Sequence, residues 1–446
     1  MIAALGARPV GPAEVANTVP FCSRRGLIAW ALYDWAATPF TTLMLTFIFP
    51  VYFVQAVVGD PVIGQAVWGY AASASGLIIA ILIPALGAIA DAGGRNKPWL
   101  LGSSAICVLA SMLTWFVEPT ASFAVWGVIL IVIGNVGYAS GIVFNNAMLP
   151  SLVPKDHIGR LSGWAWALGY TGGLVALVLT LLFFIRDTLP WLPLDRARAE
   201  NVRIVGLFAA AWFAAFAWPR FVWTPDRVRS GVSSGSAIRR GLVTLRTTVL
   251  GLPKTPNVAW FLAANMLYAD ALVAIFAIGG IYAAGAFKMT IAEVTSFAIV
   301  LNIAAGLGAF VFAWVDDWIG SRSTILLALC GLIIASSVAV VAQSSVWFWV
   351  AGTAMGLFVG PAQASSRSLM AKLVPPGQET EFFGLFALSG KATSFLGPAL
   401  VAVVTSISRS QRIGLAGLLI LLIAGAMALL RVSEATVSAR GRSLSS

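Results

Sequence analysis

Long apolar stretches alternate with short polar segments along almost the whole chain. Each stretch has the roughly 20 residues that a helix needs to cross the hydrocarbon of a bilayer. Helices are also the structure expected there, because a spanning segment must satisfy its own backbone hydrogen bonds. We therefore predict twelve membrane-spanning helices, over residues 27–55, 64–90, 98–117, 122–149, 160–185, 203–222, 257–285, 293–315, 323–342, 345–371, 381–406 and 413–430.

The composition agrees with a membrane protein and argues against other classes. Hydrophobic residues make up 59% of the chain and charged residues only 10%, whereas about 25% of a soluble domain is charged. The net charge of +11 does not indicate nucleic-acid binding, because the basic residues lie in loops beside apolar helices. Catalytic, nucleotide-binding and metal-ligand motifs are absent. We expect no enzyme activity, no ATP use and no cofactor.

The distribution of lysine and arginine predicts how the chain is oriented. Cytoplasmic loops carry the excess of these residues, and here the excess falls on the side of the N-terminus and of a long basic connection in the middle of the chain. Both termini should therefore be cytoplasmic. The predicted divisions are a tail (1–25), a six-helix bundle (26–223), a linker (224–255), a second six-helix bundle (256–432) and a tail (433–446).

The two predicted bundles share short sequence matches at corresponding spans. A shift of 221 residues places Leu152 to Pro154 on Leu373 to Pro375, and Gly169 on Gly390. The first span of each half also carries a tyrosine closely followed by an acid. Internal repeats of this kind are typical of transporters that are built around a central cavity.

Several motifs resemble those of one transporter family. The stretch from Gly87 to Lys97 resembles the loop motif of the major facilitator superfamily. More specific segments resemble the autophagy-related vacuole effluxer family, namely Tyr33 to Ala36, Asn146 to Gly163, Gly169 to Gly173, Gly360 to Ser368 and Phe382 to Pro398. The resemblance implies an all-α integral membrane protein of twelve helices in two pseudo-symmetric bundles, the major facilitator fold. Fungal members are associated with amino-acid efflux from the vacuole. The short loops suggest a bacterial cytoplasmic (inner) membrane.

Three charged residues lie within predicted spans, where a charge costs about 2.5 to 3.5 kcal/mol on insertion scales. They are Asp34, Asp270 and Lys391. The resemblance implies that the two aspartates face the central cavity, where they would carry protons or bind a substrate ammonium. The alternative for the aspartates is an ion pair with Lys391 or exposure at the membrane interface. Lys391 is interpreted equally as a site for an anionic group and as the partner of Asp270, because buried charges are normally paired.

Further polar and aromatic residues are candidates for substrate binding. Gln363 and Arg367 lie one turn apart near the cytoplasmic end of the tenth span, and the repeat places Arg367 on Asn146. These residues are candidates for forming a cytoplasmic vestibule that binds polar groups of the solute. Interhelical hydrogen bonding is the alternative for them and for Asn302. Tyr33 and Tyr170 complete the predicted substrate and proton site.

A gate is predicted at the cytoplasmic ends of the second and eighth spans. Asp91, Gly94 and Arg95 belong to the loop motif, and Asp317 is the equivalent acid in the second half. An acid there can accept hydrogen bonds from a helix N-terminus or an arginine when the cytoplasmic side closes. The alternative is a glycine turn flanked by basic residues that only set the orientation.

These observations predict a secondary transporter that moves an amino acid, or a similar zwitterion or anion, by proton-coupled alternating access. The expected partners are a small-molecule substrate, protons and the lipid bilayer, and we expect a monomer that binds no nucleic acid. A lipid or amphiphile exporter would instead have a mostly apolar cavity. A membrane sensor or assembly factor on the same fold would leave substrate levels unchanged when Asp34 or Lys391 is replaced.

Overall fold

A computed structural model describes residues 22–93, 96–148, 152, 158–186, 194–226, 255–373, 386, 389–390 and 392–433. The structural statements below concern these residues. Within them, every regular element is a helix.

The first half of the chain forms six membrane-spanning segments. The first segment changes its winding three times, through α1 (Arg24–Pro39), the π-helix η2 (Phe40–Phe47), α2 (Phe49–Tyr52) and the π-helix η3 (Phe53–Val58). The others are α3 (Pro61–Gly93), α4 with η4 (Lys97–Leu113 and Thr114–Phe116), η5 with α5 (Ala121–Phe123 and Ala124–Ala147), α6 with the π-helix η8 (Ile158–Leu179 and Thr180–Ile185), and α7 (Glu200–Trp223).

The second half repeats this arrangement. Its helices are α9 (Pro256–Ala286), α10 (Ile291–Ile319), α11 (Ser321–Val341), α12 (Ser345–Leu373), α14 (Leu396–Ser408) and α15 (Gln411–Leu430). Eleven described helical segments are long and apolar enough to cross a membrane, and α14 is a shorter apolar helix at the position of the eleventh predicted span. Most spans begin or end within a few residues of their predicted limits.

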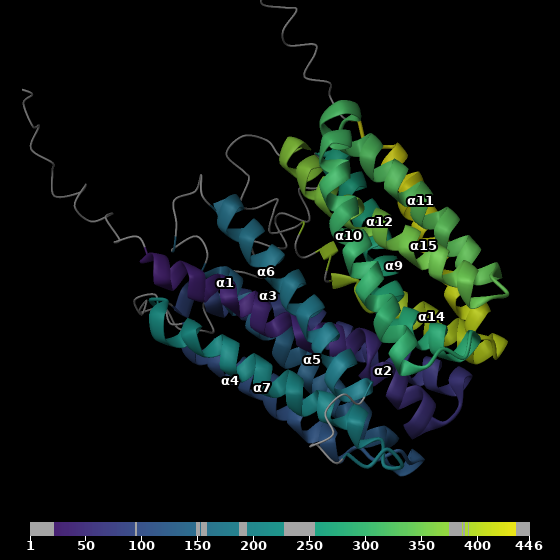
Figure 1. The fold of residues 1–446 in the computed structure, drawn as a ribbon. Coiled ribbons are helices and arrows are strands. Elements are labelled where there is room, and N and C mark those ends of the chain that lie inside the picture. Colours follow the sequence, from purple (N-terminus) through teal and green to yellow (C-terminus); the bar gives the residue numbers. More distant parts are fainter. Residues whose placement is uncertain are drawn as a thin grey trace, which may run out of the picture.

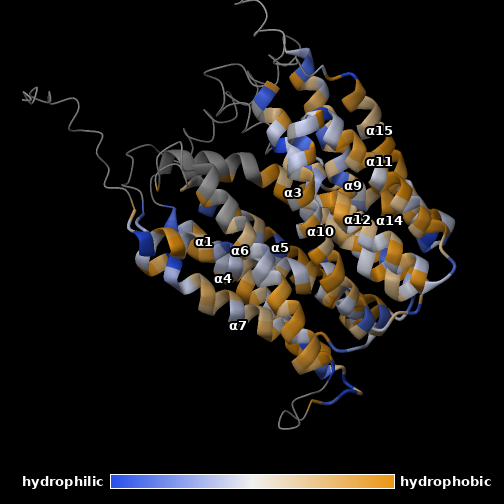
Figure 2. Ribbon diagram, turned by 45° about the horizontal axis from the view of Figure 1, so that its top comes forward, coloured by the Kyte–Doolittle hydropathy of each residue, from blue (hydrophilic) through white to orange (hydrophobic). Residues whose placement is uncertain are grey.

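The outer surface of the helices is apolar, as lipid contact requires. Figure 2 shows hydrophobic residues along the middle of the helices and hydrophilic residues gathered near their ends. Exposed tryptophans lie near both ends of the bundle, with Trp99, Trp223 and Trp318 at one end and Trp126 and Trp347 at the other. Tryptophan is enriched where the hydrocarbon meets the headgroups. The chain is therefore a multi-pass membrane protein.

The two halves use equivalent side chains to fix equivalent helix ends. Lys97, at the start of the third span, donates a hydrogen bond of 2.8 Å from Nζ to the carbonyl oxygen of Phe221, at the end of the sixth. Arg322, at the start of the ninth span, donates one of 2.8 Å to the carbonyl oxygen of Leu430, at the end of the twelfth. A cation stabilises the C-terminal end of a helix, where carbonyl groups lack partners.

The opposite end of each half carries a second matching pair. Arg203, early in the sixth span, donates from Nε to the carbonyl oxygen of Trp115 over 2.8 Å. Arg412, early in the twelfth span, donates to the carbonyl oxygen of Val340 over 3.4 Å. Together with the helix-end cations, these contacts show that the two halves are built on one repeated plan (Figure 1).

The halves are joined by neutral hydrogen bonds at the end of the bundle that carries the 59–60 and 409–410 connections. The Nε2 atom of Gln65 on α3 donates to the Thr405 hydroxyl over 2.9 Å and to the Gln411 carbonyl oxygen over 3.3 Å. Gln411 donates in return to the Pro61 carbonyl oxygen over 2.8 Å. Nearby, Gln55 donates to the Met289 carbonyl oxygen over 3.4 Å. We call Gln55, Gln65 and Gln411 the amide latch.

Glycines let α3 and α14 approach closely beside the amide latch. A Cβ at Gly69 would meet the Pro398 carbonyl oxygen at 3.0 Å, and one at Gly76 would meet the Phe395 backbone at 3.1 Å. Small residues are the usual means by which membrane helices pack backbone to backbone. This end of the bundle is therefore closed by direct contact between the halves.

Replacing Gln65 with alanine should weaken this closed end. The change removes two hydrogen bonds between the halves, each worth about 1 kcal/mol, and so should raise the population opened at this end about tenfold or more. The measurement is the distance distribution between spin labels at Ile63 and Ile407, which are exposed on α3 and α14. Gln343→Ala, in an exposed loop of the same end, is the matched control. An unchanged distribution in Gln65→Ala would show that the latch does not hold this end shut.

Candidate functional site

A cavity of about 460 Å³ lies between the two halves. This volume falls within the range that binds small organic molecules in proteins. Most of the lining comes from α1, η2, α3, α5 and α6, and a smaller share comes from α9, α10, α14 and Ser394 just before α14. The lining residues are Asp34, Thr38, Thr41, Thr42, Leu45, Thr46, Phe47, Trp68, Ala72, Ser75, Gly76, Ile79, Ile131, Asn135, Tyr138, Ala139, Ile142, Asn146, Gly169, Tyr170, Val273, Phe276, Ala277, Asn302, Ser394 and Pro398.

Asp34 is the one charged residue among the described residues that line this cavity. Its carboxylate makes no hydrogen bond or ion pair with another described residue. Its charge acts electrostatically on the hydroxyls of Tyr33 and Tyr138. A half-buried carboxylate within a membrane span is costly when no described residue supplies a cationic partner. Such a group is stabilised by taking up a proton or by binding a cation.

A proline sets the local geometry that follows Asp34. Pro39 lies inside α1 and has no backbone N–H to donate to the carbonyl oxygen of Trp35, four residues earlier. That oxygen instead accepts a hydrogen bond of 3.2 Å from the Trp212 indole of α7. The chain then continues as the π-helix η2. π-Helical turns are rare and occur frequently at functional sites.

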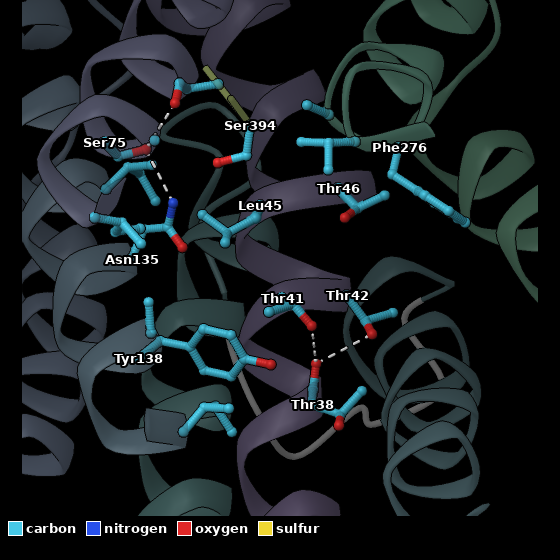
Figure 3. A pocket seen from close by; sticks show the side chains of 18 of the residues that line it. Thr38, Thr41, Thr42, Leu45, Thr46, Ser75, Asn135, Tyr138, Phe276 and Ser394 are labelled. Carbon is cyan, nitrogen blue, oxygen red and sulfur yellow. Dashed lines mark hydrogen bonds between the residues drawn. The ribbon is translucent and has the colours of Figure 1, made fainter. Parts of the chain in front are cut away.

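Threonines place a row of hydroxyls along this part of the cavity. Thr38 donates to the carbonyl oxygen of Asp34 over 2.7 Å, and Thr41 and Thr42 both donate to the carbonyl oxygen of Thr38, over 2.8 and 3.1 Å. Figure 3 shows these three side chains together, with Thr46 farther along the same segment. The hydroxyls hold carbonyl groups at the break in the helix, and their oxygens remain able to accept hydrogen bonds from a solute.

Three glycines of α6 allow it to lie directly against the Asp34 segment. A Cβ at Gly172 would meet the Trp35 carbonyl oxygen at 2.7 Å, and Cβ atoms at Gly169 and Gly173 would meet the hydroxyls of Thr38 and Thr42 at 2.8 Å. These glycines belong to the predicted family motif. Their role is to permit close approach, while Tyr170 between them lines the cavity.

The remaining predicted binding residues divide into two groups. Asn146, Tyr170 and Asn302 line the cavity with Asp34. Arg367, on α12, acts electrostatically on Tyr170 across the boundary between the halves, although neither Arg367 nor Gln363 is among the lining residues. Arg367 and Tyr170 therefore lie within electrostatic reach of each other although they come from different halves. The vestibule of Gln363, Arg367 and Asn146 stays a prediction.

Tyr33 and Asp270 do not line the cavity. The Tyr33 hydroxyl shares a hydrogen bond of 2.9 Å with Ser104 of α4, so this side chain joins helices within its own half. Asp270 is 1% exposed and faces the Thr393 hydroxyl. Its Oδ1 atom has no hydrogen-bond partner among the described residues. Its place in the mechanism remains a prediction.

Part of the predicted set lies outside the described residues. Lys391, Gly94 and Arg95 belong to it. Asp91 and Asp317 lie near the ends of α3 and α10, at matching positions in the two halves, but their side chains are not among those described. The gate and the role of Lys391 therefore stay predictions.

Several lining residues were not predicted from the sequence. Thr38, Thr41, Thr42 and Thr46 are spaced by three and four residues, which places them on one face of a helix. This spacing beside an intramembrane acid could have identified them. Ser75 and Tyr138 carry no comparable signal, because neither belongs to a run of polar residues at helical spacing beside an intramembrane charge.

Comparison with known proteins shows that most of the chain matches one protein family. The model of the family described as "Vacuole effluxer Atg22 like" matches residues 57–439. The "Uncharacterized MFS-type transporter YxiO" of Bacillus subtilis (strain 168) is 24% identical over 92% of this chain and 95% of its own length. "Autophagy-related protein 22" of Coccidioides immitis (strain RS) is 24% identical over 75% of this chain and 67% of its own.

Solved structures with the same fold are transporters of the major facilitator superfamily. A D-xylose-proton symporter superposes with a TM-score of 0.70 at 12% identity, covering 93% of this chain and 99% of its own. A mutant of the nucleoside transporter NupG gives a TM-score of 0.69 at 15% identity, covering 91% and 99%. A bacterial homologue of the lysosomal transporter Spinster, in an inward-facing and unoccupied conformation, gives 0.63 at 13% identity, covering 92% and 94%. At these identities the comparison establishes the fold.

Proposed function

Because the chain belongs to the vacuole effluxer Atg22-like family and has the major facilitator fold, we propose that it moves a small polar solute by proton-coupled alternating access. The observation that carries the proposal is the Asp34 carboxylate, which has no partner among the described residues and lies in a cavity lined by hydroxyl and amide groups beside apolar side chains. Membership in the family supports transport. The choice of solute and of coupling ion rests on the site.

Asp34 is suited to carry the coupling proton. Ionisable residues within membrane spans commonly mark ion pathways and proton relays. The Asp34 carboxylate faces the cavity without a cation among its described neighbours, so protonation removes an uncompensated negative charge. A neutral carboxyl group can pass through an occluded state more easily than a charged one. Its protonation can therefore be linked to closing of the cavity around the solute.

The contacts between the halves suggest how access alternates. The amide latch closes the end of the bundle opposite the linker, and its hydrogen bonds involve only neutral groups. Such a latch can break and re-form without separating buried charges, which would cost more. The two halves would then rock about the cavity, as in other transporters built from repeats.

Amino acids and similar zwitterions are the first solutes to consider. Asp34 supplies a negative group, and Lys391 is predicted to supply a positive one. An alternative role for Asp34 is direct capture of the substrate ammonium group. The hydroxyl and amide groups of the lining offer hydrogen bonds to a polar solute, while most of the lining surface is apolar and can cover its carbon skeleton. A lipid or amphiphile is the second candidate, because a mainly apolar cavity is what that alternative expects.

Orientation follows from the positions of the basic residues. We propose that the linker and both termini face the cytoplasm, that the boundaries at residues 26–223 and 256–432 delimit the two bundles, and that a monomer in the cytoplasmic membrane is the transporting unit. Under this orientation the amide latch lies on the extracytoplasmic side, and the conformation described above is closed there.

Transport by the purified protein in liposomes tests the proposal. A panel of labelled amino acids should show uptake that accelerates when a pH gradient is imposed and ceases when a protonophore dissipates the gradient. Protein-free liposomes and liposomes without a gradient are the controls. If a labelled solute moves at the same rate with and without a gradient, the proton-coupling part is wrong. If none of the panel moves, amino acids are not the substrate.

A further inference from the structure

A neutral hydrogen-bonding surface lies in the cavity apart from Asp34. It consists of Ser75 on α3, Asn135 on α5 and Ser394 just before α14, which we call the amide pocket. All three residues line the cavity, and they come from both halves of the chain. Figure 3 shows Ser75, Asn135 and Ser394 near Leu45, whereas Thr38 lies at the other side of the view. Asp34 and Leu45 are eleven residues apart along one helical segment, which corresponds to about 15 Å.

Asn135 is held in place by hydrogen bonds that leave part of its amide available. Its Nδ2 atom donates to the Ser75 hydroxyl over 2.9 Å, and Ser75 donates in turn to the Ala72 carbonyl oxygen over 2.9 Å. The Ser75 side chain is buried, so these two consecutive hydrogen bonds hold the Asn135 amide in a fixed orientation. An amide has two N–H donors and one oxygen acceptor. The second N–H and the Oδ1 atom of Asn135 make no hydrogen bond with another described residue.

Asn302 offers a second amide from the other half, at the side of the cavity where α10 packs against α6 and η2. Its Nδ2 atom donates to the Ala298 carbonyl oxygen of its own helix over 2.8 Å. One N–H and the Oδ1 atom again remain without a partner among the described residues. Two preorganised amides, one in each half, therefore present a donor and an acceptor to the same cavity. Polar groups left without partners in a membrane protein are costly unless water or a ligand satisfies them.

The surroundings of the amide pocket favour a neutral group on a short carbon skeleton. Trp68, Ile131 and Phe276 line the same cavity and can cover methylene groups. None of the described residues of this pocket is charged. A carboxylate or a second ammonium group bound there would lose its hydration without gaining a counter-charge from these described residues.

We propose that the amide pocket binds a carboxamide or hydroxyl group of the solute and selects against charged side chains. The inference rests on the proposed transport function and narrows its substrate class to small solutes with a neutral polar side chain. Among amino acids, this selects glutamine, asparagine, serine and threonine over glutamate and leucine. Glutamine and glutamate have nearly the same shape, so comparing their binding separates the effect of charge from the effect of size.

Equilibrium binding to the purified protein tests the amide pocket independently of transport. Labelled L-glutamine should bind, unlabelled L-glutamine should displace it, and L-glutamate and L-leucine should compete at least about tenfold less well. Asn135→Leu, which keeps the branching at Cγ and removes both polar atoms, should weaken L-glutamine binding about tenfold, the effect of one or two lost hydrogen bonds. Ser75→Ala should weaken it less, because the amide remains but loses its support.

Asn201→Leu, on α7 and away from the cavity lining, is the matched control and should leave binding unchanged. Monodisperse elution and an unchanged melting temperature of Asn135→Leu exclude misfolding. Equal competition by L-glutamate and L-glutamine, or unaltered L-glutamine binding in Asn135→Leu, would overturn the proposal. If L-glutamine binds as expected but a pH gradient does not drive its uptake, the amide pocket stands and only proton coupling is refuted.

Discussion

Replacing Asp34 with asparagine is expected to abolish proton-driven accumulation of the solute while exchange of labelled for unlabelled solute continues. Asparagine has nearly the same shape as aspartic acid and remains neutral, so the variant resembles a permanently protonated carrier. It can bind solute and change conformation, but it cannot release a proton. Accumulation under a pH gradient should fall at least about tenfold, because coupling through this group is lost altogether. The two assays use the same proteoliposomes.

Glu118→Gln is the matched control for this prediction. Glu118 lies in the connection before α5 and does not line the cavity, so its neutralisation should leave both activities unchanged. Gradient-driven accumulation by Asp34→Asn at the wild-type rate would refute the coupling role. Loss of exchange together with accumulation would instead indicate that Asp34 binds the substrate ammonium directly.

Replacing Gly172 with leucine should have the largest effect on folding. The two helices α1 and α6 meet at this glycine, where even a Cβ would lie 2.7 Å from the Trp35 carbonyl oxygen and 3.1 Å from the Trp35 Cα. The obstacle is backbone, which cannot rotate away. Overpacking of a well-packed site costs about 1 to 3 kcal/mol, and displacement of α1 also moves Asp34. We expect a lower melting temperature, poor recovery of monodisperse protein and no transport.

Gly102→Leu provides the comparison. Gly102 lies on the exposed side of α4, where a Cβ would meet nothing within 4 Å. The same increase in volume should therefore leave stability and transport near the wild-type values. If Gly172→Leu and Gly102→Leu behave alike, close approach of α1 and α6 is not needed for the fold.

The architecture could be predicted from the sequence because lipid imposes strong limits on it. A span must be apolar over roughly 20 residues, and the predicted spans around Ser345–Leu373 or Pro256–Ala286 follow that rule. The repeat between the halves was also visible in the sequence. The structure adds matching contacts from residues such as Lys97 and Arg322, which the sequence alone does not pair with particular helix ends.

The site was less predictable, because it depends on how each helix is rotated about its axis. Tyr33 and Asp34 are neighbours in the chain, but successive residues of an α-helix point about 100° apart. One joins α4 through Ser104 and the other faces the cavity. Asp270, an intramembrane acid like Asp34, does not line the cavity. The position of an acid within a span therefore predicts the free-energy cost of placing it there. It does not predict whether the side chain faces the cavity.

The winding of the first span was not predicted either. Pro39 alone predicts a kink or an interrupted hydrogen bond. The π-helix that follows depends on tertiary contacts, including the Trp212 indole that satisfies the Trp35 carbonyl oxygen. Such a partner lies 177 residues away in the chain, beyond the reach of local sequence patterns.

Accessibility of the cavity from the two sides of the membrane tests alternating access most directly. Ala139 lines the cavity, so Ala139→Cys in a variant without Cys22, Cys107 and Cys330 places a small reporter there. A thiol reagent that cannot cross the bilayer should label this cysteine from the linker side in the absence of solute. Adding the solute with a pH gradient should slow that labelling and allow labelling from the opposite side. Labelling that is unaffected by the solute, or that proceeds equally from both sides at once, would contradict the account.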